Sequence, residues 1–387
     1  MPPRTGHPAV RAQSANWLDH RMKIFHCDHC DQLAFFENTQ CVRCGHLLAF
    51  LTDLAEIGSL ESSDQLTWTS PMARDATYRL CRNYTEANVC NWAIPGGDDH
   101  DLCASCRLTR VIPDLTRSGH HQAWYKLEVA KRRLVYTLLN LRLPLVSRTD
   151  DPDRGLAFEF LADPDDPSLP RAMTGHGDGV ISVNLAEADD AEREKRRVSL
   201  HEPYRTLLGH MRHESGHYYW DRLIRDDAVR LEAFRASFGD ERREYGAALR
   251  DHYAQGPPPD WQTRFVSTYA SAHPWEDWAE SWAHYLHMTD TLETAAACGV
   301  SIRPRRSDEP SLRAVPAEAG TPEPPFDRML NSWFPLTYVL NNLNRGMGHA
   351  DAYPFVLPDP AIAKLRFVHA IVVSALPDAI GRPFSPF

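Results

Sequence analysis

The sequence predicts an α+β protein in which a small, cysteine-rich module precedes a mainly helical domain that contains a small β-sheet. Three observations support this prediction. Eight of the nine cysteines fall between residues 27 and 106, at spacings that suit metal ions. Long stretches of the remaining chain carry apolar residues at helical spacing, and short stretches between them alternate as strands do.

The composition excludes several classes of protein. With 387 residues, 43% hydrophobic and 24% charged, the chain resembles an ordinary globular protein with two domains. Since no apolar run approaches the ~20 residues that cross a bilayer, we expect no membrane partner. A formal charge of −10 argues against a nucleic-acid partner. Residues 1–22 lack the apolar core of a secretory signal, so we expect a disordered tail and a cytoplasmic location.

Residues 23–110 are expected to form a double zinc-ribbon module. Cys27 and Cys30, followed ten residues later by Cys41 and Cys44, make two C-x-x-C knuckles that can hold one tetrahedral zinc ion. A rubredoxin-like iron site is the alternative. The short spacer and the missing glycine after Cys30 favour zinc.

The second set consists of Cys81, Cys90, Cys103 and Cys106, and its first pair is widely spaced. A Cys81–Cys90 disulfide is the alternative, which a reducing compartment disfavours. Four thiolates leave no open position on an ion, so both sets predict structural zinc ions. The module carries seven Lys or Arg against twelve Asp or Glu. We therefore expect it to bind a protein partner or to pack on the next domain, rather than to bind nucleic acid.

The first elements of residues 111–387 can be assigned by periodicity. A helix is expected over Leu115–Leu141, and a strand over Leu156–Phe160. A turn at Gly175–Gly179 then leads into a strand over Val180–Leu185, which we expect to be an antiparallel edge strand. His176 is expected to lie in the turn and not to bind metal.

The next helix, expected from Glu202 to about Arg225, contains the pattern H-E-x-x-H. His213 and His217 stand one turn apart on one face, where two imidazoles can hold one zinc ion. Glu214 can reach a water on the open side of that ion and act as general base. Gly216 inside a helix costs roughly 1 kcal/mol against alanine, which predicts the close approach of another element.

A third ligand is required. Metzincins would place it in an extended motif, but Trp220 and Leu223 stand at the motif's glycine and histidine positions. A later helix instead carries Glu276 and Glu280 on one face. We predict that Glu276 binds the metal and that Glu280 hydrogen-bonds a zinc histidine, with Asp277 as the alternative ligand.

Other polar residues flank these helices. Tyr269 and His273 are candidates to stabilise an oxyanion, although Tyr269 is equally consistent with a core position. His210, His284 and His287 are expected to be structural, packing or surface groups.

The last part of the chain lacks a catalytic cluster. Cys298 has no partner and is expected to be a buried thiol. Residues 303–325 are rich in proline and predict a loop. Residues 326–387 are expected to contain two helices, Phe326–Leu343 and Pro360–Leu376.

Three motifs resemble a family of bacterial zinc-binding metallopeptidases that carries an N-terminal zinc-ribbon region: His213–Asp221, Phe238–Arg242 and His273–His287. Tyr353–Leu357 and Lys364–His369 are also similar to it, so the resemblance covers nearly the whole chain after residue 20. It implies a zincin-like domain over residues 111–387 and a peptide or protein substrate.

The spacing of Tyr269, Glu276 and Glu280 is similar to that in the catalytic helix of anthrax lethal factor-like proteases. This likeness favours Glu276 over Asp277 as ligand and supports a catalytic Tyr269. The sequence thus predicts a gluzincin-type peptidase with one catalytic zinc ion and two structural ones. The alternative is a non-catalytic adaptor that binds a protein through its ribbons, against which the intact Glu214 argues.

Overall fold

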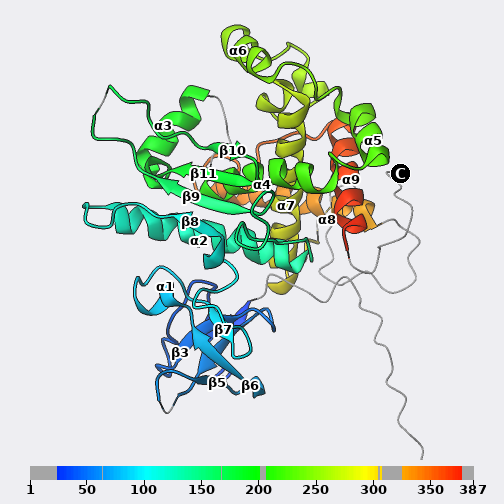
Figure 1. Cartoon of the computed structure of the whole chain (residues 1–387). Coiled ribbons are helices and arrows are strands. Elements are labelled where there is room, and N and C mark those ends of the chain that lie inside the picture. Colours follow the sequence, from blue (N-terminus) through cyan, green and yellow to red (C-terminus); the bar gives the residue numbers. More distant parts are fainter. Residues whose placement is uncertain are drawn as a thin grey trace, which may run out of the picture.

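The computed structural model describes residues 24–62, 64–166, 168–200, 206–303, 306 and 325–376. The predicted tail and most of the proline-rich segment therefore lie outside the described residues. A β-rich module lies at the bottom of Figure 1, below a larger and mainly helical part. The described residues include no helix that is both long and apolar enough to cross a membrane.

The N-terminal module consists of short antiparallel strands joined by turns that carry the cysteines. Its elements are β1 (Phe25–His26), β2 (Leu33–Ala34), β3 (Leu47–Leu51), β4 (Glu56–Leu60), β5 (Trp68–Ser70), β6 (Ala73–Leu80), α1 (Arg82–Thr85), β7 (Ala93–Pro95) and η1 (Cys106–Leu108). β1 pairs with β2, β3 with β4, and β6 lies between β5 and β7. These hairpins are the scaffold that a zinc ribbon requires.

The larger part contains one four-stranded sheet in the order β10-β11-β9-β8. Its strands are β8 (Thr109–Val111), β9 (Ala157–Leu161), β10 (Gly175–Gly177) and β11 (Val180–Asn184). The sheet is parallel except for β10, which pairs antiparallel with β11.

Two sequence predictions for this sheet need correction. The first residues of the predicted turn form β10, and β10 rather than β11 is the strand at the edge. β8 was missed because three residues are too short to show an alternating pattern. The predicted boundary at residue 110 falls inside β8.

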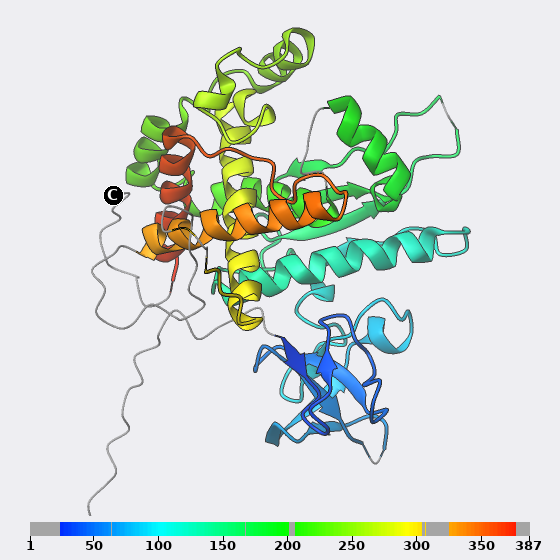
Figure 2. The ribbon, with the colours of Figure 1, turned by 180° about the vertical axis from the view of Figure 1, so that it is seen from behind.

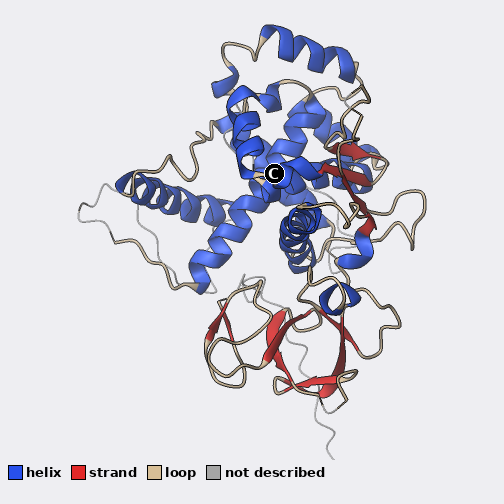
Figure 3. Cartoon of the chain, turned by 90° about the vertical axis from the view of Figure 1, so that its left-hand side faces the viewer, coloured by secondary structure: helices blue, strands red, loops and turns tan. Residues whose placement is uncertain are grey.

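Helices make up most of the larger part, which confirms the predicted α+β class (Figure 3). They are α2 (His120–Asn140), η2 (Leu185–Ala188), α3 (Asp190–Leu200), α4 (Leu207–Leu223), α5 (Ala228–Phe238), α6 (Tyr245–Gln255), η3 (Trp261–Thr263), η4 (Tyr269–Ser271), α7 (Pro274–Ala297), α8 (Pro325–Gly346) and α9 (Asp359–Ser374).

Helix ends follow local capping signals. Thr206 caps α4, its side chain accepting a hydrogen bond from the amide of Gly209 at 2.9 Å, while the predicted start at Glu202 lies outside the described residues. α5 ends at Phe238 and is capped by Gly239, whose φ of 104° suits glycine. Cys298, expected to be buried, is exposed at the C-cap of α7.

α4 and α7 cross in close contact at Gly216. A Cβ atom at this position would lie 2.9 Å from Cα of Ala279 and 3.2 Å from Cβ of Trp282. Trp278 Nε1 donates to the carbonyl of Gly216 at 2.8 Å, and Trp282 Nε1 donates to Ser215 Oγ at 3.1 Å. The close approach predicted from this glycine is confirmed.

α2 joins the N-terminal module to the rest of the molecule. In Figures 1 and 2 it lies between the module and α4. The ring of Tyr136 packs against Phe36 and Phe50 of the module, with centroid distances of 5.5 and 5.8 Å. Arg133 Nε donates to Glu37 Oε1 at 2.7 Å. Buried residues of both parts form one continuous hydrophobic core, so the module is packed on the helical part and not merely tethered to it.

We predict that Gly216→Ala lowers the free energy of unfolding by up to about 2 kcal/mol. The added methyl group meets the α7 backbone at a cost of about 1–3 kcal/mol, from which the ~1 kcal/mol that alanine gains in helix propensity is subtracted. Gly246→Ala in α6 is the matched control, since its Cβ would meet only side-chain tips of Arg250 and Glu244, each at 3.2 Å. Urea unfolding of both variants in the same metal state measures the difference. Equal or greater stability for Gly216→Ala would contradict the close crossing.

Candidate metal centres

The first cysteine set lies in the turns that follow β1 and precede β3. Cys27, Cys30, Cys41 and Cys44 bring their sulfur atoms within 4.8 Å of one another. Sγ of Cys27 lies 3.7 Å from that of Cys44, and Sγ of Cys30 lies 3.6 Å from that of Cys41. Thiolates bonded at ~2.3 Å to one tetrahedral zinc ion are about 3.8 Å apart. The set therefore has the spacing of a closed four-thiolate site.

The second set is buried at the junction with the helical part. Cys81, Cys90, Cys103 and Cys106 form a group of the same kind, with 3.7 Å between the sulfur atoms of Cys90 and Cys103. All nine cysteines are free thiols, so the alternative Cys81–Cys90 disulfide does not form.

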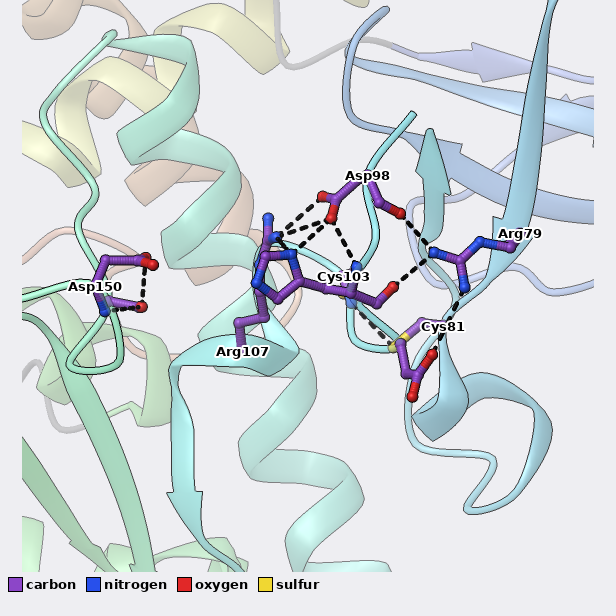
Figure 4. A network of polar contacts seen from close by, with 9 residues as sticks. Arg79, Cys81, Asp98, Cys103, Arg107 and Asp150 are labelled. Atoms are coloured by element: carbon purple, nitrogen blue, oxygen red, sulfur yellow. Dashed lines mark hydrogen bonds and ion pairs between the residues drawn. The ribbon is translucent and has the colours of Figure 1, made fainter. Parts of the chain in front are cut away.

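The loop that carries this set is fastened by two arginines (Figure 4). Arg79 donates to the carbonyl oxygens of Asp98 and His100. Arg107 forms an ion pair with Asp98 at 2.9 Å. The network lies beside Cys81 and Cys103 in Figure 4 and restricts the loop without using a metal ligand.

A buried cation from α2 lies next to the same set. Arg132 is only 2% exposed, and its guanidinium donates to the carbonyl of Val89. Burial alone would lower the pKa of Arg132, but negative charge at Cys90 and Glu128 outweighs it and raises that pKa. Arg132 therefore places a buried positive charge beside the second cysteine set.

The third group lies between α4 and α7. Nε2 of His213 is 3.0 Å from Oε2 of Glu276, and Nε2 of His217 is 3.6 Å from Oε1 of the same carboxylate. All three residues are buried, and their ligand atoms lie within 4.8 Å of one another. Four ligand atoms at ~2.1 Å from a zinc ion would be about 3.4 Å apart. The donor set and the spacing both fit zinc.

Glu280 lies where the sequence places it, one turn after Glu276. Its Oε1 is 2.7 Å from Nδ1 of His213, and Ser267 Oγ donates to its Oε2 at 2.5 Å. Such a carboxylate fixes the ring so that Nε2 faces the ligand group.

The alternative ligand, Asp277, is engaged elsewhere. It is fully buried and forms an ion pair with Lys364 of α9 at 2.6 Å. Burial raises the pKa of Asp277 to about 7, and Lys364 opposes that shift. Asp277 therefore links α7 to α9 and is absent from the ligand group.

Glu214 follows His213 on α4 and is also buried. Burial raises the pKa of Glu214, while His213 and His217 oppose this shift. A carboxylate with a raised pKa holds a proton more readily near neutral pH, which suits a group that accepts and returns one.

Two tyrosines lie near the ligand group, and the sequence identified only one of them. The ring centroid of Tyr269 is 5.8 Å from that of His213. Tyr245, at the start of α6, donates its hydroxyl hydrogen to Oε1 of Glu276 at 2.5 Å and is 37% exposed. Burial raises the pKa of both tyrosines, so both are neutral donors at neutral pH. Tyr245 had no signal in the sequence, because its contact with Glu276 spans 31 positions.

His273, the other oxyanion candidate, uses both ring nitrogens in structural contacts. Nδ1 accepts a hydrogen bond from the amide of Trp275 and thereby caps α7. Nε2 lies 3.0 Å from the carbonyl of Arg243, to which it donates. Since neither nitrogen is left for a substrate, the expectation that His273 could stabilise an oxyanion is not supported.

Three other histidines, His176, His284 and His287, lie outside the group formed by His213, His217 and Glu276. His176 is in β10 rather than a turn, with its ring centroid 5.9 Å from that of His217. His284 is buried, with Nδ1 2.7 Å from the hydroxyl of Tyr353. His287 stacks on the same tyrosine. Both are packing groups, as predicted.

The fold and these groups define a zinc-binding metalloprotein with an N-terminal ribbon module. Residues 24–117 match a zinc-ribbon domain, and residues 120–371 match a family described as "putative zinc-binding metallo-peptidase". Proteins of Mycobacterium tuberculosis and Mycobacterium bovis, both named as uncharacterized, are 43% identical over 357 residues, which are 92% of this chain and 97% of theirs. No solved structure matches. The chain belongs to this zinc-binding metallo-peptidase family, which confirms the resemblance.

We predict that His213 is protonated at neutral pH in the metal-free protein. Burial alone would lower the pKa of His213, but Glu276 and Glu280 outweigh burial and hold it well above the ordinary range. The raised pKa of His213 adds to the free energy of unfolding. This contribution is fully present below the unfolded pKa of ~6.5 and is lost as the pH rises through the folded pKa.

NMR of protein with carbon-13-labelled histidine would measure this titration. Glu280→Gln removes one of the two carboxylates and should lower the pKa of His213. Glu187→Gln, at a buried carboxylate outside the ligand group, is the matched control. A His213 titration near 6.5 in the unmodified protein would show that the two carboxylates do not hold the proton.

Proposed function

We propose that the protein is a zinc-dependent peptidase of the gluzincin type, with zinc bound by His213, His217 and Glu276. The observation that carries this proposal is the convergence of two imidazoles and one carboxylate, with Glu214 adjacent on the same helix. Membership of the metallo-peptidase family supports it. A bound zinc ion would lower the pKa of a water molecule toward ~7 and polarise the peptide carbonyl.

The residues around the group have separate roles in this proposal. Glu214 takes a proton from the attacking water and returns it to the leaving amine. Glu280 keeps Nδ1 of His213 protonated, so that Nε2 presents its lone pair to the metal. A zinc ion bound by His213 and Glu276 would replace the proton that these two residues share in the metal-free protein.

Tyr245 is the stronger candidate to donate to the carbonyl oxygen of the cleaved bond. Its hydroxyl already reaches a ligand atom of Glu276, and its partial exposure places it where substrate can arrive. Tyr269, the sequence candidate, is more deeply buried, with 5.8 Å between its ring centroid and that of His213. We propose that Tyr245 carries this role and that Tyr269 packs behind the histidine.

The proposed substrate is a peptide or protein in extended conformation. β10 lies at the edge of the sheet and packs next to α4. One side of its backbone pairs with β11, and the other side faces away from the sheet. A peptide can add to such an edge through main-chain hydrogen bonds, largely independently of its sequence. The proposal further places two structural zinc ions in the cysteine sets, and the free thiols suit the reducing cytoplasm.

A non-catalytic adaptor is the second candidate. Apolar side chains are exposed around the first cysteine set: Leu33 (44%), Phe35 (65%) and Val42 (85%). Such a surface suits a protein partner. A partner that binds through Leu33, Phe35 and Val42, together with no cleavage by the intact protein, would favour the adaptor.

We predict that Glu214→Gln, after a weak chelator has removed loosely bound ions, keeps three zinc ions per chain and lowers peptide cleavage at least ~100-fold, because the general base is lost. Elemental analysis and a fluorogenic peptide library measure the two quantities. Glu232→Gln makes the same chemical change at an exposed position of α5 and should leave both unchanged. Undiminished cleavage by Glu214→Gln would sink the mechanism.

His217→Ala separates the catalytic centre from the cysteine sets in the same assay. The proposal requires three ions to become two, since one imidazole and one carboxylate hold zinc poorly. An unchanged count would mean that the ion is bound elsewhere or not at all.

We predict that Tyr245→Phe lowers kcat/KM by ~100-fold or more through the loss of one donor to the developing negative charge. Tyr269→Phe should have a smaller effect. Tyr253→Phe, 59% exposed on α6, is the control for a lost phenol hydroxyl. A large loss only in Tyr269→Phe would return the role to that residue.

A further inference from the structure

A fourth group of metal-type ligands lies in the ribbon module, outside both cysteine sets. His29, His46 and Glu61 bring ligand atoms within 4.8 Å of one another. They come from three segments: His29 lies inside the first knuckle, His46 two residues after the second, and Glu61 directly after β4. The catalytic group and the two cysteine sets use none of them.

The distances from Glu61 to the two histidines are close to those of ligands around one ion. Nδ1 of His29 is 3.8 Å and Nε2 of His46 is 3.6 Å from the same oxygen, Oε1 of Glu61. Both separations are too long for hydrogen bonds. They are close to the ~3.4 Å expected between nitrogen and oxygen ligands of one zinc ion. His217 and Glu276 of the catalytic group show the same 3.6 Å spacing.

Asp28 of the first knuckle is hydrogen-bonded to β4 and β5. Oδ1 of Asp28 accepts a hydrogen bond from the amide of Ser59 in β4 at 2.6 Å. Its Oδ2 accepts from Ser70 Oγ at 3.0 Å and from the amide of Met72 at 3.2 Å. Asp28, which directly precedes His29, thus links the first knuckle to β4, the strand that ends next to Glu61. The backbone segments that carry His29 and Glu61 are therefore held close to each other.

The imidazoles would have to move on binding, which makes the site weaker than the others. The rings of His29 and His46 are stacked at 3.8 Å, whereas those of His213 and His217 are 5.1 Å apart. The side chains of His29 and Glu61 are 43% and 55% exposed, so they can shift without disturbing the core. Three ligands at the surface also leave a coordination position open to water.

We propose that His29, His46 and Glu61 form a fourth, exchangeable binding site for Zn²⁺ on the ribbon module. Two imidazoles and one carboxylate are ligands that zinc accepts, and magnesium or calcium would prefer oxygen ligands alone. The open position can hold water or a donor group from another molecule. The site does not depend on the peptidase reaction and is present whether or not the protein cleaves peptides.

The test measures Zn²⁺ binding by isothermal titration calorimetry on full-length protein carrying His217→Ala, which removes the catalytic site. A weak chelator first strips loosely bound ions, and elemental analysis verifies that two ions remain in the cysteine sets. We expect one further Zn²⁺ to bind. Glu61→Gln and His29→Ala should each weaken that binding at least ~10-fold.

His26→Ala is the matched control, because His26 is exposed on β1 but lies outside the group. Its titration should equal that of the parent. Glu61→Gln lies outside both knuckles and keeps the test valid if His29→Ala loses a cysteine-bound ion. No additional ion in the parent protein, or equal affinity in Glu61→Gln, would overturn the proposal.

Discussion

The crossing of α4 and α7 at Gly216 is the constraint on which the rest of the site depends. Only a residue without a side chain lets Cα of Ala279 come as close as the structure requires. At this separation, His213 and His217 on one helix meet Glu276 on the other. Trp278 and Trp282 then close the crossing by donating to the chain around Gly216, so hydrogen bonds and packing maintain the same geometry.

The buried carboxylates around this crossing each lie close to a histidine or lysine side chain. Glu276 and Glu280 are like charges one turn apart, an unfavourable arrangement on a helix. His213 lies between them and interacts with both, which compensates for their burial. Asp277, between them in sequence, points to Lys364 of α9 instead. Each buried carboxylate of this helix segment therefore has a cationic or protonated partner, as burial of charge demands.

The ribbon module is linked to this centre by packing rather than by shared ligands. α2 inserts Tyr136 into the module's aromatic core and places Arg132 beside the second cysteine set. The same helix packs against α4. α2 thus contacts both the second cysteine set and the helix that carries His213 and His217, so the packing of the module and that of α4 are physically coupled.

A family resemblance supported Glu276 over Asp277 as ligand. Local spacing determined the first cysteine set, the shared faces of His213 with His217 and of Glu276 with Glu280, and the need for a close approach at Gly216. These are properties of residues one helical turn or one knuckle apart, which the chain shows directly. Tertiary structure decided that Tyr245 reaches Glu276, that His273 caps α7, that Asp277 pairs with Lys364 and that β10 forms the edge. Each depends on segments that are distant in sequence or on a backbone group without a side-chain signature, and only packing of the whole chain brings such partners together.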